Sequence, residues 1–250
     1  MSKTVDVGFY SALYSNIDRG NISTIAELER NTSPALDMNY RRLLPVDKNA
    51  RILDIGCGWG YFLHYLGKNG YSNISGIDSR HHAVRLDFIR KNITKDVIGI
   101  DRVESYLNEH KNEYDLIVLQ QVIYYFRRED LTGIMQAIKD SLKPGGILIV
   151  ETFNGSLMTS CFVQNWDYER SLIFTEYSLA EIIIDSGLKL KELFGMESPR
   201  SNGLKSSCRI FIRNIWISVL KLVYAIERGT DAPLVPHIFS KNIIAVGQKR

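Results

Sequence analysis

The chain has 250 residues, 24% of them charged, and a formal net charge of +3, a length and balance that suit one α/β enzyme domain. No stretch of about 20 residues is uninterruptedly apolar and the N-terminus lacks the apolar core of a signal peptide, so neither a membrane-spanning helix nor a secreted protein is expected. Three cysteines without metal-ligand spacing argue against a disulfide framework, and we expect the reducing cytoplasm as the location.

The first segment, residues 1–48, has large apolar side chains along one face of an expected helix. These are Phe9, Tyr10, Leu13 and Tyr14. Such a stripe either packs on a sheet or contacts a substrate, and the sequence leaves both roles open.

A buried strand at 51–55 is predicted to run into a glycine-rich turn and then into a helix at 61–68 that Gly70 ends. Three glycines alternate in the turn: Gly56, Gly58 and Gly60. They leave out side chains where the backbone must bend tightly and approach a ligand, and Asp54 places a carboxylate beside them. NAD and FAD are disfavoured, because the third glycine of their G-x-G-x-x-G pattern would fall on Tyr61.

A second strand at 73–77 leads to Asp78, 24 residues beyond Asp54. A carboxylate at the end of this strand can accept hydrogen bonds from both hydroxyls of a ribose. Asp78 could also cap the helix that follows, and the two roles are compatible.

Strands are also predicted at 97–100, 114–119 and 147–152. The helix between the last two has apolar residues at helical spacing: Leu131, Ile134, Met135, Ile138 and Leu142. The segment 143–146, Lys-Pro-Gly-Gly, ends this helix. Strands that alternate with helices predict a mostly parallel sheet covered on both faces.

Further along, Ser178 and Glu181 predict a capping box for a helix that ends at Ser186. Two last strands are expected at 188–194 and 242–246. The insert between them contains a helix at 207–228 that is apolar around most of its circumference.

Residues 200–228 of the insert carry six basic side chains and one acid, Glu227. The helix at 207–228 therefore has three readings: it caps a substrate cleft, forms a dimer interface, or lies on an anionic membrane surface. A basic surface near a cleft would suit an acidic or phosphate-bearing acceptor.

The pattern D-x-G-x-G-x-G at 54–60 and the Leu-Lys-Pro-Gly-Gly run at 142–146 resemble the class I S-adenosylmethionine-dependent methyltransferases. This resemblance covers about residues 45–194 and the tail. It implies an α/β, Rossmann-like fold with a seven-stranded, mostly parallel sheet whose last strand is antiparallel. It also implies four parts of the chain: an N-terminal helical lid at 1–48, a cofactor-binding core at 49–194, a helical insert at 195–236 and the last strand at 237–250.

The resemblance implies S-adenosyl-L-methionine as the cofactor. Asp54 and the glycine turn would face its amino-acid end and ribose, Asp78 would hold the ribose hydroxyls, and Ile77 or Ser79 would flank the adenine. Asp101 would reach the adenine amino group, unless it is the N-cap of a helix from Val103. The expected cofactor-binding residues are Asp54, Gly56, Cys57, Gly58, Gly60, Asp78, Ser79, Asp101, Gln120 and Gln121.

Methyl transfer from a sulfonium requires mainly alignment, because the leaving group is neutral, so a base is needed chiefly for hydroxyl acceptors. Many relatives have a Glu-His pair where this chain has Tyr124 and Tyr125, and tyrosine is a poor base near neutral pH. Glu151 and the pair His81-His82 are further candidates for a base, and Tyr125 and His237 are the expected catalytic residues. No metal-binding spacing occurs, so no metal is expected.

The insert and the tail are similar, more weakly, to methyltransferases of bacterial surface-polysaccharide (O-antigen or capsule) assembly. This predicts O-methylation, by in-line displacement, of a sugar in a polysaccharide or in its nucleotide- or lipid-linked precursor. The alternatives are a small-molecule or quinone O-methyltransferase, an RNA methyltransferase, and an inactive cofactor-binding partner subunit. A nucleic-acid partner is disfavoured, because no wide basic stripe with interleaved aromatics is evident. Through 207–228 the chain is expected to form a homodimer, join an enzyme complex, or lie peripherally at the inner face of the membrane.

Overall fold

The computed structural model describes residues 22–32, 34–199, 204–229 and 235–250. The aromatic stripe expected at residues 9–14 lies outside these ranges. Seven strands form one sheet: β1 (Ile52–Ile55), β2 (Ile74–Ser79), β3 (Val97–Ile100), β4 (Tyr114–Gln120), β5 (Leu142–Phe153), β6 (Lys189–Gly195) and β7 (Asn242–Gln248). All seven predicted strands are present, with ends shifted by a few residues and β5 extended at its start.

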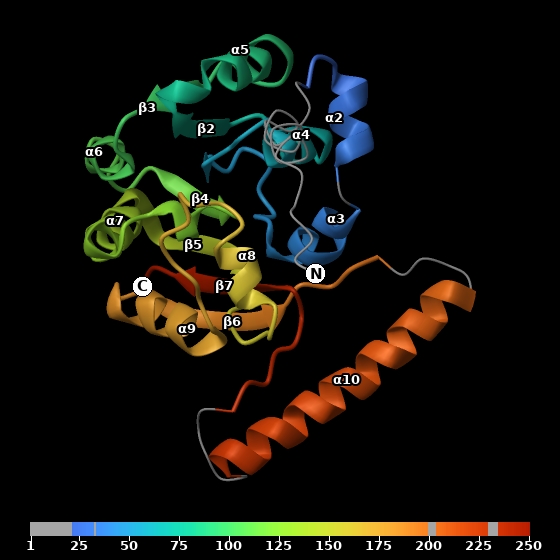
Figure 1. The fold of residues 1–250 in the computed structure, drawn as a ribbon. Helices are drawn as coiled ribbons and strands as arrows, with labels where there is room; N and C mark the ends of the chain where they lie inside the picture. Colours follow the sequence, from blue (N-terminus) through green and yellow to red (C-terminus); the bar gives the residue numbers. More distant parts are fainter. Residues whose placement is uncertain (1–21, 33, 200–203, 230–234) are drawn as a thin grey trace.

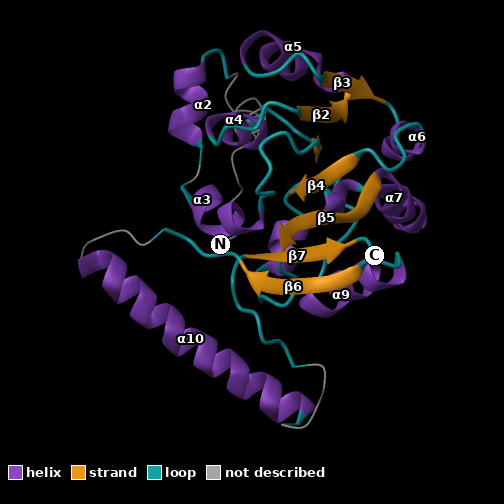
Figure 2. Cartoon of the chain, turned by 180° about the vertical axis from the view of Figure 1, so that it is seen from behind, coloured by secondary structure: helices purple, strands orange, loops and turns teal. Residues whose placement is uncertain are grey.

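The strand order is β3-β2-β1-β4-β5-β7-β6. The strands from β3 to β5 pair in parallel, whereas β7 is antiparallel to both β5 and β6 (Figure 2). This confirms the expected mostly parallel sheet with an antiparallel last strand. The carboxyl ends of β1, β2, β4 and β5 therefore meet at one edge, where ligands bind in open parallel sheets.

Helices cover both faces of the sheet (Figure 1). The first face packs on α6 (Val103–Asn108), α7 (Arg128–Ser141) and α9 (Glu176–Asp185). The second face packs on α2 (Ile25–Asn31), α3 (Ala35–Tyr40), α4 (Tyr61–Lys68) and α5 (Ala83–Asn92). The remaining helical segments are η1 (Arg41–Leu43), η2 (Arg80–His82), η3 (Ile123–Tyr125), α8 (Ser160–Gln164) and α10 (Leu204–Arg228).

The capping box predicted for Ser178 and Glu181 is wrong. The N-cap of helix α9 is Thr175, three residues before Ser178, and the helix begins at Glu176. The Thr175 hydroxyl accepts a hydrogen bond from the N–H of Ser178, and the Ser178 hydroxyl accepts one from the N–H of Thr175. A serine at the third helical position thus closes the box, a role more often filled by Glu or Gln.

Helix α10 runs along the outside of the molecule, at the side of the sheet that ends in β6 (Figures 1 and 2). One side of the helix is attached to the body: Leu220 is buried, and the Tyr224 hydroxyl donates to the carbonyl oxygen of Ser156 at 3.0 Å. Within the described residues, no helix combines the length and the apolarity needed to cross a bilayer.

Candidate functional site

The glycine turn after β1 has all three glycines in the left-handed region, with φ of +73°, +54° and +79° at Gly56, Gly58 and Gly60. A Cβ atom at Gly56 would lie 2.5 Å from Cγ2 of Val122, and one at Gly60 would lie 2.9 Å from Ile89. A Cβ atom at Gly58 would meet nothing within 4 Å. The outer glycines are thus required by packing, whereas the middle one borders open space that a ligand can occupy.

The Asp78 carboxylate lies directly beside this turn. Its Oδ2 accepts the N–H of Gly58 at 2.6 Å, and its Oδ1 accepts the N–H of Ser79 at 2.7 Å and lies 2.9 Å from Nδ1 of His82. Burial raises the pKa of Asp78, but the hydrogen bonds from His82 and Gly58 outweigh burial, so its pKa lies below the usual value. The capping role that the sequence allowed for Asp78 falls instead to Ser79, whose hydroxyl accepts the N–H of His81.

Asp54, at the end of β1, is a buried carboxyl without a partner. It is 2% exposed, and no hydrogen bond from the described residues reaches its carboxylate. Burial raises its pKa well above the usual value, and the nearby charge of Asp78 raises it further. An ionised group in this position is stabilised by a cationic ligand, because burying an unpaired charge is otherwise costly.

A second buried carboxylate, Glu151 in β5, is surrounded by donors. It accepts hydrogen bonds from the Tyr40 hydroxyl at 2.5 Å, from Gln121 Nε2 at 2.6 Å, from Asn242 Nδ2 at 2.8 Å and from Gln120 Nε2 at 3.3 Å. We refer to these five residues as the Glu151 cluster. It joins the helix that precedes η1 to the ends of β4, β5 and β7.

The alternation of side chains along each strand explains why the cluster lies where it does. Asp54, Gln120 and Glu151 each lie two positions after a residue of β1, β4 or β5 that packs on the second face, so their side chains point to that same face. Gln120 is also paired with Glu151 in the register of β4 and β5. Burial raises the pKa of Tyr40, and the charges of Glu151 and Asp54 raise it further. The Glu151 cluster and the glycine turn therefore belong to one site at the carboxyl edge of the sheet.

Gln121 has two features of a ligand-binding residue. Its φ is +57°, a strained value for a side chain of this size, and its Oε1 atom is buried without a hydrogen-bond partner. Its Nε2 atom is fixed by Glu151, so the unpaired oxygen is held in place. A donor from a ligand, such as an ammonium group, would satisfy it.

Tyr125 lies in η3, just after β4, and its hydroxyl donates to Asp167 at 3.1 Å. Burial raises the pKa of Tyr125 above its usual value, and the Asp167 carboxylate contributes in the same direction. A raised pKa makes a tyrosine a weaker base at neutral pH.

A small pocket lies next to η3 and the end of β5. The Arg170 guanidinium lies over the rings of Tyr124 and Phe153, at 5.0 and 4.8 Å from their centroids. Two buried polar atoms in this pocket, Oγ1 of Thr152 and Nε of Arg170, have no partner. The rest of the lining is largely apolar and includes Leu172.

Three expected site residues lie apart from this group. Asp101 is exposed and pairs with Arg80, and it is not the N-cap of α6, because that position is Arg102. The Cys57 side chain is buried in the core, where burial raises the pKa of its thiol, so only its backbone can face a ligand. His237 is exposed; its N–H donates to Glu176, and no described contact joins its ring to Tyr125.

Sequence reasoning missed the partners of Glu151. Tyr40 is 111 residues away from Glu151 in the chain and Asn242 is 91 residues away, so no local pattern could bring them together. It also missed His82 as the partner of Asp78, although their separation of four residues was a usable signal. Among the described residues, no three His, Cys, Asp or Glu side chains are grouped so as to hold a metal ion.

The site fits S-adenosylmethionine. The open space at Gly58 admits the ligand, the Asp78 carboxylate can accept ribose hydroxyls, and the unpaired Asp54 and Gln121 oxygens suit a cationic amino-acid end. No described residue fills the open space at Gly58 or pairs with the Asp54 and Gln121 oxygens.

Comparisons with known proteins agree with this fit. A family model described as a methyltransferase domain matches residues 28–193. The ubiquinone biosynthesis O-methyltransferase of Shewanella pealeana is 25% identical over 156 residues, which cover 58% of this chain and 61% of that enzyme. The tRNA U34 carboxymethyltransferase of Vibrio atlanticus is 31% identical over 139 residues, covering 52% of this chain and 41% of that protein. The matches thus span less than two thirds of either relative.

Two solved structures share the fold. A methyltransferase from Archaeoglobus fulgidus described as dependent on S-adenosylmethionine has a TM-score of 0.61 at 19% identity, covering 96% of this chain and all of that one. A chain from the complex of the Haloferax volcanii Trm112 methyltransferase activator with a putative methyltransferase has a TM-score of 0.63 at 15% identity, covering 98% and 99%.

Proposed function

The chain belongs to the family of S-adenosylmethionine-dependent methyltransferases, and on that basis we propose that it methylates a hydroxyl oxygen of a small acceptor. The observation that carries this proposal is the open space at Gly58 between an ionised Asp78 and an unpaired, buried Asp54. A cytoplasmic location is part of the proposal, because Cys57, Cys161 and Cys208 are all free thiols.

When bound, the cofactor supplies a methyl group on a positively charged sulfur. The protein's task is alignment: Asp78 fixes the ribose, while Asp54 and the Oε1 atom of Gln121 orient the amino-acid end. Glu151 holds Gln121 in its strained conformation and does not act as a base, because its oxygens are already occupied by four donors. Tyr40 ties the proposed lid, residues 1–48, to this arrangement.

The proposed acceptor subsite lies at η3 and at the mouth of the adjoining pocket of Tyr124, Phe153 and Arg170, because the pocket itself has room for about one water molecule. Tyr125 and His237 stay the proposed catalytic residues. Tyr125, whose hydroxyl donates to Asp167, can accept a hydrogen bond from the acceptor hydroxyl and orient it. His237 has an exposed imidazole, whose ring nitrogen can accept a hydrogen bond from the acceptor hydroxyl.

Two acceptor classes follow from different observations. A sugar is the acceptor expected from the sequence of the insert and tail, and the Arg170 Nε and Thr152 Oγ1 atoms could bind its polar groups. A phenol of the quinone-precursor type is favoured by the apolar, aromatic lining of the pocket and by the ubiquinone-pathway relatives. The two curated relatives reported above are named for ubiquinone biosynthesis and for tRNA, and neither name mentions a sugar, so we place the phenol first.

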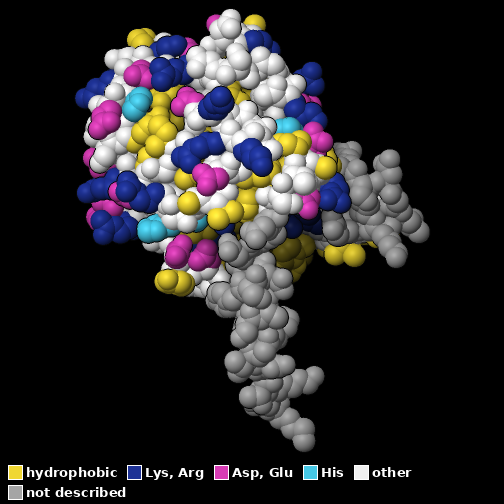
Figure 3. Space-filling model, turned by 90° about the horizontal axis from the view of Figure 1, so that it is seen from above, with side chains coloured by type: hydrophobic (Ala, Val, Ile, Leu, Met, Phe, Trp, Pro, Cys, Tyr) yellow, Lys and Arg dark blue, Asp and Glu magenta, His cyan; other side chains and the backbone are white. Residues whose placement is uncertain are grey.

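An RNA acceptor has less support. Basic and acidic side chains are interspersed on the face shown in Figure 3, instead of forming a basic stripe. The alignment with the tRNA-modifying relative covers only about half of this chain. A catalytically inactive partner subunit would retain the cofactor site but show no turnover with any acceptor.

The test is calorimetric titration with S-adenosylmethionine and S-adenosylhomocysteine, followed by a methyl-release assay on two panels, dihydroxybenzenes and nucleotide sugars. We expect micromolar binding of both cofactor forms and turnover with the phenols. An Asp78→Asn variant should lose cofactor affinity, whereas Asp115→Asn, at the opposite end of the sheet, is the matched control. Absence of cofactor binding would contradict the site, and binding with turnover only on sugars would reverse the order of the acceptors.

A further inference from the structure

Helix α10 has an apolar face that none of the described residues covers. Eight large side chains on one side of the helix are each between 42% and 74% exposed. This apolar stripe consists of Phe211, Ile212, Ile215, Trp216, Val219, Leu222, Val223 and Ile226. At about 100° per residue they cover a sector of roughly 140° that no charged residue interrupts. A patch of this size on a soluble domain marks an interaction surface.

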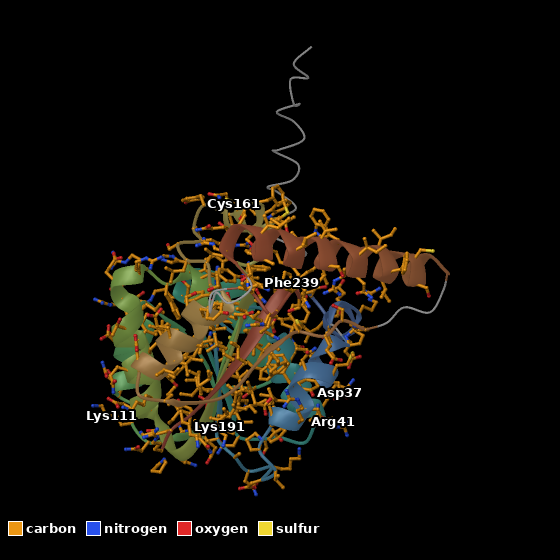
Figure 4. All side chains as sticks on the ribbon, turned by 90° about the horizontal axis from the view of Figure 1, so that it is seen from below. Asp37, Arg41, Lys111, Cys161, Lys191 and Phe239 are labelled. Carbon is orange, nitrogen blue, oxygen red and sulfur yellow. The ribbon has the colours of Figure 1, made fainter. Side chains whose placement is uncertain are left out.

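The opposite side of α10 is already in contact with the body. Arg213 donates to the carbonyl oxygen of Phe239, and the Lys221 ammonium lies 5.8 Å from the centre of the Phe239 ring. Figure 4 shows Phe239 beside the helix. These cations therefore face the body, and the apolar stripe is the side left for a partner.

The spacing within the stripe is that of a coiled-coil seam. Ile212, Val219 and Ile226 are seven residues apart, and Ile215 and Leu222 follow the first two by three residues. A repeat of 3.5 residues keeps a seam facing one partner helix along its whole length, here about 22 Å from residue 211 to residue 226. β-Branched residues at the first of the two seam positions with leucine at the second favour a pair of helices, and Val219 with Leu222 follows this rule.

We propose that α10 pairs with α10 of a second copy of this chain, so that the apolar stripe is the core of a homodimer interface. A two-fold pairing places the same stripe on both sides, and a stripe without charges meets no like-charge repulsion. The aromatic side chains Phe211 and Trp216 alone contribute on the order of 200 Å² per protomer to an interface that needs about 600 Å² from each.

An anionic membrane is the competing partner, and the charge distribution disfavours it. A helix that lies in a lipid surface gains affinity when basic residues can reach the headgroups. Arg213 and Lys221, the basic residues of α10 with a described contact, are turned toward Phe239 instead of flanking the stripe. The dimer does not depend on the proposed acceptor.

The test is sedimentation velocity of the full-length protein over a concentration series. The wild type is expected to sediment as a dimer, twice its mass of 28.6 kDa. The double variant Val219→Lys, Leu222→Lys should be monomeric, with a dissociation constant raised at least about 100-fold by buried like charges. Asn214→Lys adds a charge to the same helix outside the stripe and should stay dimeric.

S-Adenosylhomocysteine binding, measured by calorimetry, should be the same in all three proteins and reports that each is folded. A monomeric wild type overturns the proposal, as does an Asn214→Lys variant that dissociates as readily as the double variant. Co-sedimentation of a monomeric wild type with phosphatidylglycerol vesicles, lost in the double variant, would assign the stripe to the membrane instead.

Discussion

Asp54 and Glu151 are both 2% exposed at the same edge of the sheet, yet their surroundings are opposite. Glu151 accepts four hydrogen bonds from side chains of the protein, whereas no described donor reaches Asp54. A buried carboxylate that is fully bonded holds the structure together, and one that is left unpaired costs free energy until a ligand arrives. Glu151 therefore belongs to the part of the site that maintains its structure, whereas Asp54 belongs to the part that is left for the ligand.

The largest effect is expected at Glu151. A Glu151→Ala variant leaves the buried donors of Tyr40, Gln121 and Asn242 without an acceptor and should lower the free energy of unfolding by about 3–4 kcal/mol. Urea denaturation measures this change. Glu151→Gln keeps an acceptor oxygen and should cost less. If Glu151→Ala were as stable as the wild type, Glu151 would not be structural and would not differ from Asp54 in this respect.

Asp54→Ala should have the reverse profile. Its stability should equal or exceed that of the wild type, because the raised pKa shows that the ionised carboxyl is unfavourable in the free protein. Its affinity for S-adenosylmethionine should fall about 100-fold, a loss of about 2.7 kcal/mol. Calorimetry and urea denaturation on one sample distinguish the two quantities. A loss of stability as large as that of Glu151→Ala would show that Asp54 is structural.

The two glycines offer a finer comparison within the turn. Gly56→Ala places a Cβ atom 2.5 Å from Val122 and should cost about 2–3 kcal/mol of stability. Gly58→Ala should cost only about 1 kcal/mol, from its positive φ, but should weaken cofactor binding by narrowing the open space. Thermal unfolding with and without S-adenosylhomocysteine measures both effects. Equal ligand-induced stabilisation of Gly58→Ala and wild type would contradict a ligand at that position.

The smallest effect is on the pH dependence of cofactor affinity. The folded pKa of Asp54 is raised, so the stability of the free protein falls as pH rises above the unfolded value of about 3.9. A cationic ligand binds the ionised form, so affinity should rise with pH, by at most about tenfold per pH unit, and level off above the folded pKa. Asp78 has a lowered pKa and stays ionised over this range. In Asp54→Asn, cofactor affinity should depend much less on pH. An unchanged dependence would show that another group causes it.

The glycine turn, the seven strands and Asp78 could be predicted because the relevant signals are local: glycine spacing, apolar runs and a carboxylate at the end of a strand. The Glu151 cluster could not, since Tyr40 and Asn242 reach Glu151 only through helix packing and strand register. The adenine contact of Asp101 stays a prediction from its position after β3, and the structure shows its carboxylate paired with Arg80 of a neighbouring segment.

The position of β7 has a consequence for synthesis of the protein on the ribosome. β7 pairs with β5 on one side and β6 on the other, and its first residue, Asn242, aligns with Phe153, about 90 residues earlier. At a synthesis rate of about 5–20 residues per second, the hydrogen-bonding edge of β5 stays unpaired for roughly 5 to 20 s. Until β7 is made, β6 also has no strand with which to pair. The nascent chain thus exposes an unpaired strand edge together with the newly made apolar helix, the interval in which a chaperone would be needed most.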